Sequence, residues 1–268
     1  MLDLLQYTFF QHALWGALLS SILCGMIGTY VVTRRLVFVS GGIAHASLGG
    51  VGMGAYMGFS PVLGAAAFAI LSAFGIRRLS SGGEVREDSA IGMLWTLGMS
   101  IGILFASLSP GFMPDLPSFL FGNILYVGTT DLWVQGALLL VVGAFFAMFM
   151  RSIVAVAFDV DFAMTQGIRV ERIETAMLVL SALTIVSCLH MMGIVLVISL
   201  LSVPQATAGY LTHHFGRLML YSAAFALLDC VGGLFLSAWL NVPSGASIIV
   251  VSVAVYFAVR TIKQVISR

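Results

Sequence analysis

The sequence predicts an all-α protein that crosses a membrane many times. Of its 268 residues, 60% are hydrophobic and 9% are charged, whereas soluble domains carry about 25% charged residues. Mean hydropathy is +1.08. The 12 Lys and Arg residues stand only between long apolar stretches, so one threading of the chain brings all of them to the same side of the membrane. We expect residues 1–268 to form a single transmembrane domain.

The basic residues also predict the orientation of this domain. Cytoplasmic loops carry an excess of Lys and Arg, so the N-terminus is expected outside and the C-terminus in the cytoplasm. The chain starts Met1-Leu2-Asp3, without the basic residues that precede the apolar run of a signal peptide, and the first span is expected to stay uncleaved. The basic residues are Arg34, Arg35, Arg77, Arg78, Arg86, Arg151, Arg169, Arg172, Arg217, Arg260, Lys263 and Arg268.

Nine apolar stretches are candidates to cross a bilayer, for which a helix needs about 20 residues. In chain order they are 12–33, 37–58, 61–76, 88–108, 132–150, 174–191, 193–211, 218–240 and 244–262. Because 61–76 is short and 37–58 is rich in glycine, eight full crossings with a broken pair are the alternative count. The loops between them are charged on the inner side, at 77–87 and 151–172, and very short on the outer side.

One further apolar segment, 116–128, is too short to cross the membrane alone. It carries no charge and is bracketed by Asp115 and Asp131. Irregular backbone at membrane depth is tolerated only against protein or a water-filled cavity. We therefore expect a short re-entrant or interfacial helix on the outer side.

The second span carries a stripe of small residues that recurs every four positions. Residues at this spacing share one face of a helix, and small residues let helix backbones approach closely in lipid. We interpret the stripe as a packing surface. Its members are Gly42, Ala46, Gly50, Gly54 and Gly58.

Ionisable residues inside the spans are candidates for function, because such groups are costly in a bilayer. At a helix rise of about 1.5 Å per residue, His45 lies about 15 Å beyond Arg35 and Asp229 about 18 Å beyond Arg217. The two side chains could share a cavity at one depth, where imidazole and carboxylate suit zinc or manganese. His190 is expected near the outer face, where it could collect a metal ion.

Each of these residues also has a structural alternative. A histidine at the midplane can bond to a neighbouring helix, and an aspartate can accept hydrogen bonds from Ser or Thr. The cysteines Cys24, Cys188 and Cys230 all lie in apolar spans, where neither a disulfide framework nor a zinc motif is indicated. We expect them to be structural thiols.

Absent motifs separate the candidate classes of protein. The sequence has no Gly-rich phosphate loop ending in Gly-Lys-Ser/Thr, no His-Glu-x-x-His and no Gly-x-Ser-x-Gly, so neither ATP hydrolysis nor a hydrolase site is expected. The charges form no nucleic-acid patch. An ion permease, a proton-coupled secondary transporter with Asp229 as proton carrier, and a membrane scaffold without substrate remain as alternatives. An intramembrane enzyme is disfavoured because no nucleophile–base pair is visible at one depth.

Four stretches, spread over almost the whole chain, resemble the permease subunit of bacterial zinc/manganese ABC importers. Their order and spacing together make the resemblance specific. They are GTYVVTRRLVF at 28–38 running into IAHASL at 43–48, EDSAIG at 87–92, LFGNIL at 120–125, and GIVLVISLLSVPQATA at 193–208, with PSGA following at 243–246.

The resemblance implies a homodimeric permease in the bacterial cytoplasmic membrane. It further implies a separate ATPase, an extracytoplasmic metal-binding protein, and zinc or manganese as transported substrate, with no permanently bound cofactor. The segment DVDFAMTQG at 159–167 is similar to the family's cytoplasmic coupling helix, Asp-Pro-x-x-Ala-x-x-x-Gly. Asp159, Ala163 and Gly167 match that pattern, whereas Val160 replaces the proline.

One departure from the family's pattern concerns the metal site. The family's second span carries Asp-Ala-x-x-His-Ala, which sets carboxylate and imidazole on one helical face. Here Gly41 stands at the aspartate position, which leaves the metal open among zinc, manganese and iron. We hypothesise that Asp229 supplies the missing carboxylate to a site shared with His45.

Overall fold

The structure, a computed structural model, describes residues 6–81, 85–109, 122 and 124–266. Eight helices in these ranges are long and apolar enough to cross a membrane, which confirms the predicted all-α polytopic fold. They are α1 (Thr8–Thr33), the pair α2 (Val37–Ala46) and α3 (Leu48–Met57), α4 (Pro61–Ser81), α5 (Glu87–Leu108), α7 (Thr129–Phe158), α9 (Val170–Met192), α12 (Phe215–Leu240) and α13 (Ser244–Ile266).

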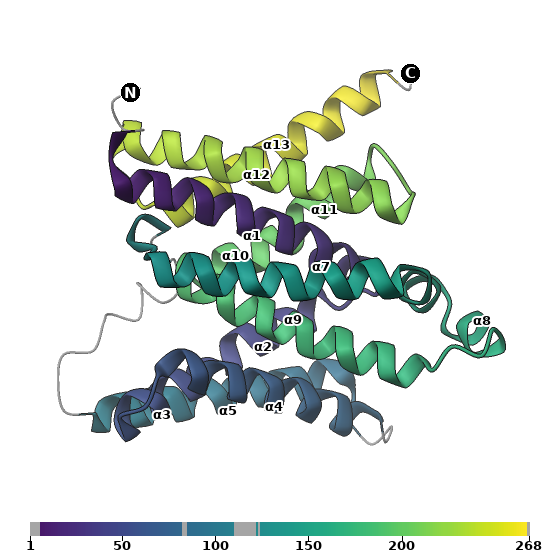
Figure 1. Cartoon of the computed structure of the whole chain (residues 1–268), viewed down its shortest axis with the longest axis horizontal. Coiled ribbons are helices and arrows are strands. Elements are labelled where there is room, and N and C mark those ends of the chain that lie inside the picture. The colour runs from purple at the N-terminus through teal and green to yellow at the C-terminus, as the bar shows by residue number, and fades with distance from the viewer. Residues whose placement is uncertain (1–5, 82–84, 110–121, 123, 267–268) are drawn as a thin grey trace.

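The seventh predicted span, 193–211, is a pair of short helices rather than one long helix. α10 (Ile194–Leu200) and α11 (Val203–Gly209) are separated at Leu201 and Ser202. Together they lead from the end of α9 back to the start of α12 (Figure 1). Residues 194–209 would extend about 24 Å as a helix, less than the hydrocarbon core of about 30 Å. In the described ranges eight spans are long enough to cross, one of which is divided into α2 and α3, and the pair α10 and α11 is a further interrupted segment rather than a ninth full span. The segment 61–76, expected to be short, belongs to the full-length helix α4.

The predicted re-entrant or interfacial helix at 116–128 falls largely outside the described residues. Of this segment the structure describes 122 and 124–128, in which Ile124–Tyr126 form a single 3₁₀ turn. Ile124 is buried, and the turn packs against α1, α9 and α13. The described part is thus a packed turn rather than a helix.

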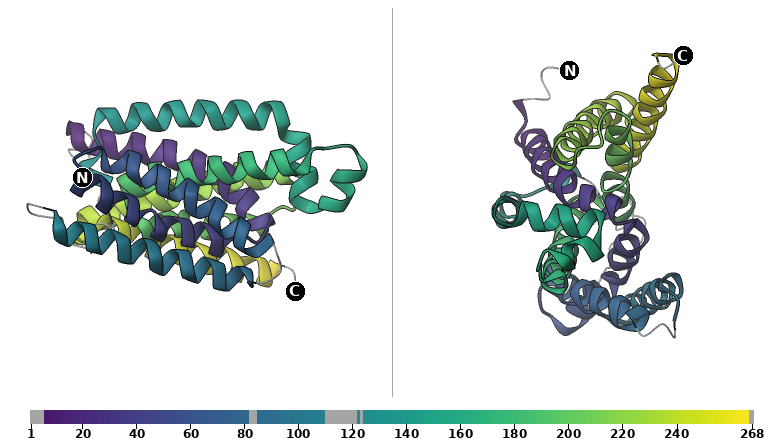
Figure 2. Two further views of the ribbon diagram at one scale, coloured as in Figure 1. Left: turned by 90° about the horizontal axis from the view of Figure 1, so that it is seen from below. Right: turned by 90° about the vertical axis from the view of Figure 1, so that its right-hand side faces the viewer.

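The helices form three groups that lie side by side in the bundle (Figure 1). α1, α11, α12 and α13 pack together, α2 to α5 form a second group, and α7, α9 and α10 lie between them. The short helix α8 (Val160–Thr165) projects beyond one end of the bundle (Figure 2). Large, fully buried side chains fill the centre, among them Leu23, Ile27, Ile185, Ile194 and Leu200.

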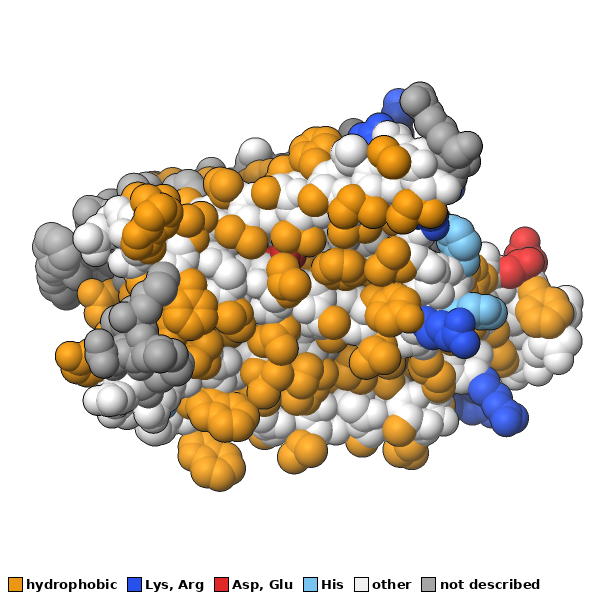
Figure 3. Space-filling model, turned by 90° about the horizontal axis from the view of Figure 1, so that it is seen from above, with side chains coloured by type: hydrophobic (Ala, Val, Ile, Leu, Met, Phe, Trp, Pro, Cys, Tyr) orange, Lys and Arg blue, Asp and Glu red, His pale blue; other side chains and the backbone are white. Residues whose placement is uncertain are grey.

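Side chains on the surface are segregated by type. On the face drawn in Figure 3, hydrophobic side chains cover the middle of the helices, and Lys and Arg gather at the end that carries α8. The apolar belt is the surface that a lipid bilayer would cover.

Small residues bring the backbones of α2 to α5 into direct contact. A Cβ at Gly50 would lie 2.0 Å from a backbone oxygen of α4, and one at Gly42 would lie 2.6 Å from the side chain of Ile91 in α5. Ala46 meets α5 at Gly98, where a Cβ would lie 2.5 Å from the Ala46 Cα. A side chain at Gly50 or Gly98 would meet backbone, so no larger residue fits at these two positions without moving a helix.

The last two glycines of the predicted stripe, Gly54 and Gly58, differ in their surroundings. A Cβ at Gly54 would lie 2.8 Å from the Cα of Pro61, so this glycine packs against the start of α4. A Cβ at Gly58 would meet nothing within 4 Å, but this residue has a φ of +76° and caps the C-terminus of α3. A left-handed cap of this kind favours glycine.

We predict that Gly50→Ala lowers the thermal unfolding midpoint of the detergent-purified protein by roughly 2–12 °C. The added methyl would meet backbone, and such overpacking costs about 1–3 kcal/mol. Gly143→Ala in α7 is the matched control, because a Cβ there meets nothing within 4 Å and alanine is the better helix former. Equal midpoints for the two variants would contradict close backbone contact between α3 and α4.

Candidate functional site

His45 lies in the last turn of α2, just before the break in the second span. Its ring stacks on that of Trp95 in α5, with centroids 4.1 Å apart and planes inclined by 11°. Its Nδ1 atom is buried and has no hydrogen-bond partner among the described residues. An unpaired buried polar group costs about 1–3 kcal/mol. A group that reached this nitrogen could therefore satisfy it.

Trp95 is itself held by its own helix. The indole Nε1 donates a hydrogen bond to the Sδ atom of Met99, 2.9 Å away and one turn further along α5. The stacked pair thus has a fixed plane, which orients the imidazole. Sequence reasoning missed Trp95, because a single aromatic residue in an apolar span carries no signal of its partner on another helix.

The break after His45 is closed by a serine. Ser47 is buried, and its hydroxyl donates to the carbonyl oxygen of Ala44 at 2.6 Å. α10 packs against α2, and the hydroxyl of Ser202 at its break donates to the carbonyl oxygen of Ile198 at 2.7 Å. Backbone groups at membrane depth need such internal partners. Two interrupted spans therefore lie side by side, with His45 at one of the breaks.

Buried glutamines and thiols join the central helices. Gln135 in α7 donates from Nε2 to the hydroxyl of Ser20 in α1 at 2.7 Å, and Gln205 in α11 donates from Nε2 to the carbonyl oxygen of Cys24 at 2.8 Å. The sulfur atoms of Cys24 and Cys188 are 4.0 Å apart, and all three cysteines are free and buried. Both glutamines were missed, although a polar residue inside an apolar span was the signal that could have found them.

Beside His45, α2 has an open position at Gly41. Gly41 lies one turn before His45 on the same face, and a Cβ there would meet only the side chain of Ile198, 3.7 Å away. The part of the chain that the structure describes contains no group of three His, Cys, Asp or Glu side chains that could hold a metal ion. Within the described residues, His45 is therefore not part of such a group.

Asp229 lies in a different neighbourhood from His45. It is 1% exposed, and its Oδ2 accepts a hydrogen bond from the hydroxyl of Ser252 in α13 at 2.7 Å, while its Oδ1 has no partner in the described ranges. α12 packs mainly against α1, α11 and α13, whereas α2 packs against α4, α5, α9 and α10. The two candidate residues are not bonded to each other in this chain.

His190 lies at the opposite end of the bundle from α8. Its Nδ1 is 3.3 Å from the Oδ1 of Asp131 in α7, and its side chain is half exposed. Asp131 also accepts from the backbone N–H of Gly128 at 3.0 Å, which caps the start of α7. The histidine thus has a carboxylate partner but no connection to His45.

The three residues expected in a coupling helix all shape α8. The Asp159 carboxylate caps the helix by accepting from the backbone N–H of Phe162 at 2.9 Å. Ala163 is fully buried, and Gly167 takes a φ of +72° where the chain turns toward α9. Phe162 and Met164 point outward and are 55% and 58% exposed. This exposed apolar pair at the end of the bundle is a surface suited to a protein partner.

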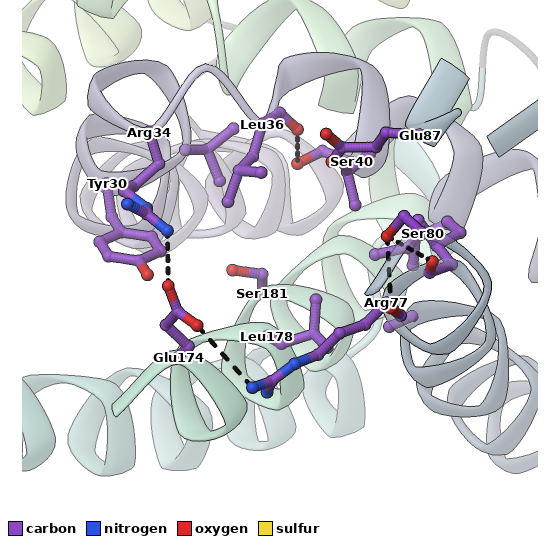
Figure 4. A pocket seen from close by; sticks show the side chains of 15 residues that line it. Tyr30, Arg34, Leu36, Ser40, Arg77, Ser80, Glu87, Glu174, Leu178 and Ser181 are labelled. Carbon is purple, nitrogen blue, oxygen red and sulfur yellow. Dashed lines mark hydrogen bonds and ion pairs between the residues drawn. The ribbon is translucent and has the colours of Figure 1, made fainter. Parts of the chain in front are cut away.

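A cavity of about 150 Å³ lies between α1, α2, α4 and α9 (Figure 4). Glu174 stands between two arginines at its edge: its Oε1 is 2.5 Å from the Nη2 of Arg34, and its Oε2 is 3.8 Å from the Nη2 of Arg77. Arg77 also donates to the hydroxyl of Thr175 at 2.6 Å. Sequence reasoning used these arginines only for topology and missed the cluster.

Comparison with known proteins gives one consistent result. The family model described as the ABC 3 transport family matches residues 6–263. The manganese transport system membrane protein MntC of Halalkalibacterium halodurans is 36% identical over 93% of this chain and 86% of that protein. The manganese import system permease protein ScaB of Streptococcus parasanguinis is 29% identical over 95% of this chain and 90% of its own length.

A solved structure shows the same fold. One chain of PsaBC from Streptococcus pneumoniae in complex with Fab superposes with a TM-score of 0.88 and 27% sequence identity, covering 96% of this chain and 93% of that chain. The helix arrangement described above is therefore shared almost from end to end.

We predict that Ser252→Ala loosens the packing of α12 on α13. It would leave the buried Asp229 carboxylate without its hydrogen bond, at a cost of about 1–3 kcal/mol, or roughly 2–12 °C in the unfolding midpoint. Thr261→Ala on α13 serves as control, since this exposed hydroxyl bonds only to its own helix at Phe257. If both variants unfolded at the wild-type temperature, the bond to Ser252 would not be what holds Asp229.

Proposed function

Because the chain belongs to the ABC 3 transport family, we propose that it is the membrane-spanning permease subunit of an ABC importer for a divalent transition metal ion. Manganese and zinc are the candidate substrates. Manganese is named for the relatives MntC and ScaB, and imidazole is a common zinc ligand. The ion is cargo rather than a resident cofactor, and the sequence has no phosphate loop for hydrolysing ATP itself.

His45 is the observation that carries this proposal. A buried imidazole nitrogen without a partner among the described residues stands at a break in one span, beside a second interrupted span. Interrupted helices at membrane depth occur against protein or along a water-filled cavity. A single ligand per chain binds weakly, which suits an ion that must leave again. A second copy of the chain would add a second His45, and on this ground we propose a homodimer.

We assign α8 as the docking site of a separate ATPase. It projects from the end that carries the basic residues, and its outward face is apolar (Figures 1 and 3). The same end is then cytoplasmic, with the N-terminus outside, in the cytoplasmic membrane of a bacterium. The residues that shape α8 are Asp159, Ala163 and Gly167, as in the expected coupling helix.

The opposite end of the bundle is the entry side in this proposal. The pair His190 and Asp131 is partly exposed there, and imidazole with carboxylate can hold a divalent ion briefly. An extracytoplasmic metal-binding protein would release its ion at this end. The hydrogen bond between Asp229 and Ser252 supports a role of Asp229 in joining α12 to α13. Because Asp229 is only 1% exposed, it is disfavoured as a proton carrier on an open route.

We predict that His45→Ala reduces metal uptake to the level of cells that lack this chain. The ATPase should still co-purify, because His45 lies away from α8. Uptake of manganese and zinc by whole cells, together with growth in metal-depleted medium, measures the effect. His213→Ala, which removes an exposed imidazole between α11 and α12, is the control. Uptake at the wild-type rate in the His45 variant would remove this residue from the mechanism.

We further predict that Phe162→Asp releases the ATPase from the permease. A charge on the exposed apolar face of α8 would have to be desolvated on docking. Co-purification of the ATPase with the tagged chain measures this, and Tyr126→Ser, which is 86% exposed at the opposite end, is the control. Absence of any co-purifying ATPase from the wild-type chain would instead favour a secondary transporter.

A further inference from the structure

We propose that Arg34 carries movement of α8 to the helix that bears His45, and that Glu174 holds Arg34 in position for this task. The inference rests on the proposed function, because it takes α8 as the docking site of the ATPase. It assigns positioning roles in transport to two residues outside both α8 and the His45 site. Three observations carry it: the contacts of Arg34, the turn that follows it, and the charges around Glu174.

Arg34 contacts both segments that support α8, the end of α7 and the start of α9, which we call its stems. Its Nη1 donates to the carbonyl oxygen of Val156 at 3.3 Å, in the last turns of α7 before α8. Its Nη2 donates to the Oε1 of Glu174 at 2.5 Å, in the second turn of α9 after α8. A guanidinium presents several donors in one rigid plane, so a single side chain can join two elements. Displacement of either stem therefore acts on the end of α1.

The connection from Arg34 to α2 is short and is closed by backbone hydrogen bonds. Arg34 caps the C-terminus of α1, and Arg35 takes a left-handed φ of 59°. The backbone N–H of Leu36 donates to the carbonyl oxygen of Val31 at 2.8 Å, and α2 begins at the next residue. A turn closed by backbone hydrogen bonds transmits a push or a rotation better than a flexible linker does. α2 in turn carries His45 in its last turn.

Glu174 is the shared counter-ion of two arginines on different helices (Figure 4). Arg34 belongs to α1 and Arg77 to α4, and each faces a different oxygen of Glu174. Glu171 is 4.0 Å from Arg77 but 88% exposed, so it is screened by water and holds Arg77 weakly. Loss of Glu174 would leave two guanidinium groups facing the same cavity. Arg34 would then lose the contact that ties it to α9.

The cavity beside this cluster gives α2 room to move. It is lined by Val39, Ser40 and Ile43 of α2, with Leu36 just before this helix, and by residues of α4 and α9. A close-packed interior resists displacement, whereas an opening of about 150 Å³ lets this part of α2 shift without overpacking. The relay thus ends at a helix segment that borders a cavity.

The test measures how fast a water-soluble reagent reaches the site of His45. It does not require a transported ion. Gly41→Cys places a thiol one turn from His45, where a Cβ meets only the Ile198 side chain at 3.7 Å, and the native cysteines are buried. The full complex with its ATPase is labelled with a water-soluble maleimide, once without nucleotide and once trapped with ATP and vanadate. The ratio of the two labelling rates is the readout.

In the Gly41→Cys protein we expect the labelling rates with and without trapped nucleotide to differ by about fivefold or more, which is the lower end of typical couplings between two sites. Adding Arg34→Gln or Glu174→Gln should bring the ratio to about one, with the ATPase still bound. Arg34→Lys, which keeps the charge but can hold one stem at a time, should give an intermediate ratio. Arg172→Gln, which removes an exposed charge from the same stem of α9, should leave the ratio unchanged.

Three results would overturn the relay. The first is a full effect of nucleotide on the labelling rate in Arg34→Gln, and the second is loss of the ATPase from that variant. The third is an equal labelling rate with and without nucleotide in the Gly41→Cys protein. The proposed function is judged separately, by metal uptake of the wild-type complex. A nucleotide response without uptake would count against metal transport and leave the role of Arg34 standing.

Discussion

Backbone N–H and C=O groups inside a bilayer have no water to bond to, so each must find a partner within the protein. Among the described residues, the second span is divided into α2 and α3 and the seventh into α10 and α11. The rest of the structure depends on how these two interruptions are satisfied. The hydroxyls of Ser47 and Ser202 close the two breaks, and Gln205 binds the carbonyl oxygens of Leu200 and Cys24. Because these partners are supplied locally, the chain can keep irregular backbone where an unbroken helix would leave no room for a ligand.

The same arrangement separates the two tasks of the proposed permease. α2 and α10 lie together in the middle of the bundle and present His45, whereas α8 and its stems form the basic end. Arg34 is the residue that contacts the stems and also stands at the start of the turn into α2. Glycines on α2 and α3 are in close contact with α4 and α5, so a displacement of α2 would act on these neighbours.

The sequence predicted those features that depend on composition and on charge position. Apolar spans bounded by basic residues follow from hydropathy, and the structure confirms the all-α polytopic fold. The predicted bounds are less exact, because α7 continues past Arg151 to Phe158 and α12 already begins at Phe215. The break in 194–209 was missed because apolar composition is the same in a broken helix and in an intact one. Trp95 and Ser252 were missed as partners of His45 and Asp229, since the partner of a side chain depends on which helices are neighbours and on how each is rotated. Equal distances from the flanking arginines predicted one depth for His45 and Asp229, but they could not show which helices are neighbours.

The central claim is that His45 faces the route of a metal ion. A structure of the complete complex with its ATPase, determined with manganese or zinc present and with the metal identified by anomalous scattering, tests it most directly. The account predicts an ion about 2.0–2.2 Å from a nitrogen of His45, with further ligands from water or from the second copy of the chain. An ion bound elsewhere along the membrane domain, with the imidazole still stacked on Trp95 in dry packing, would contradict it.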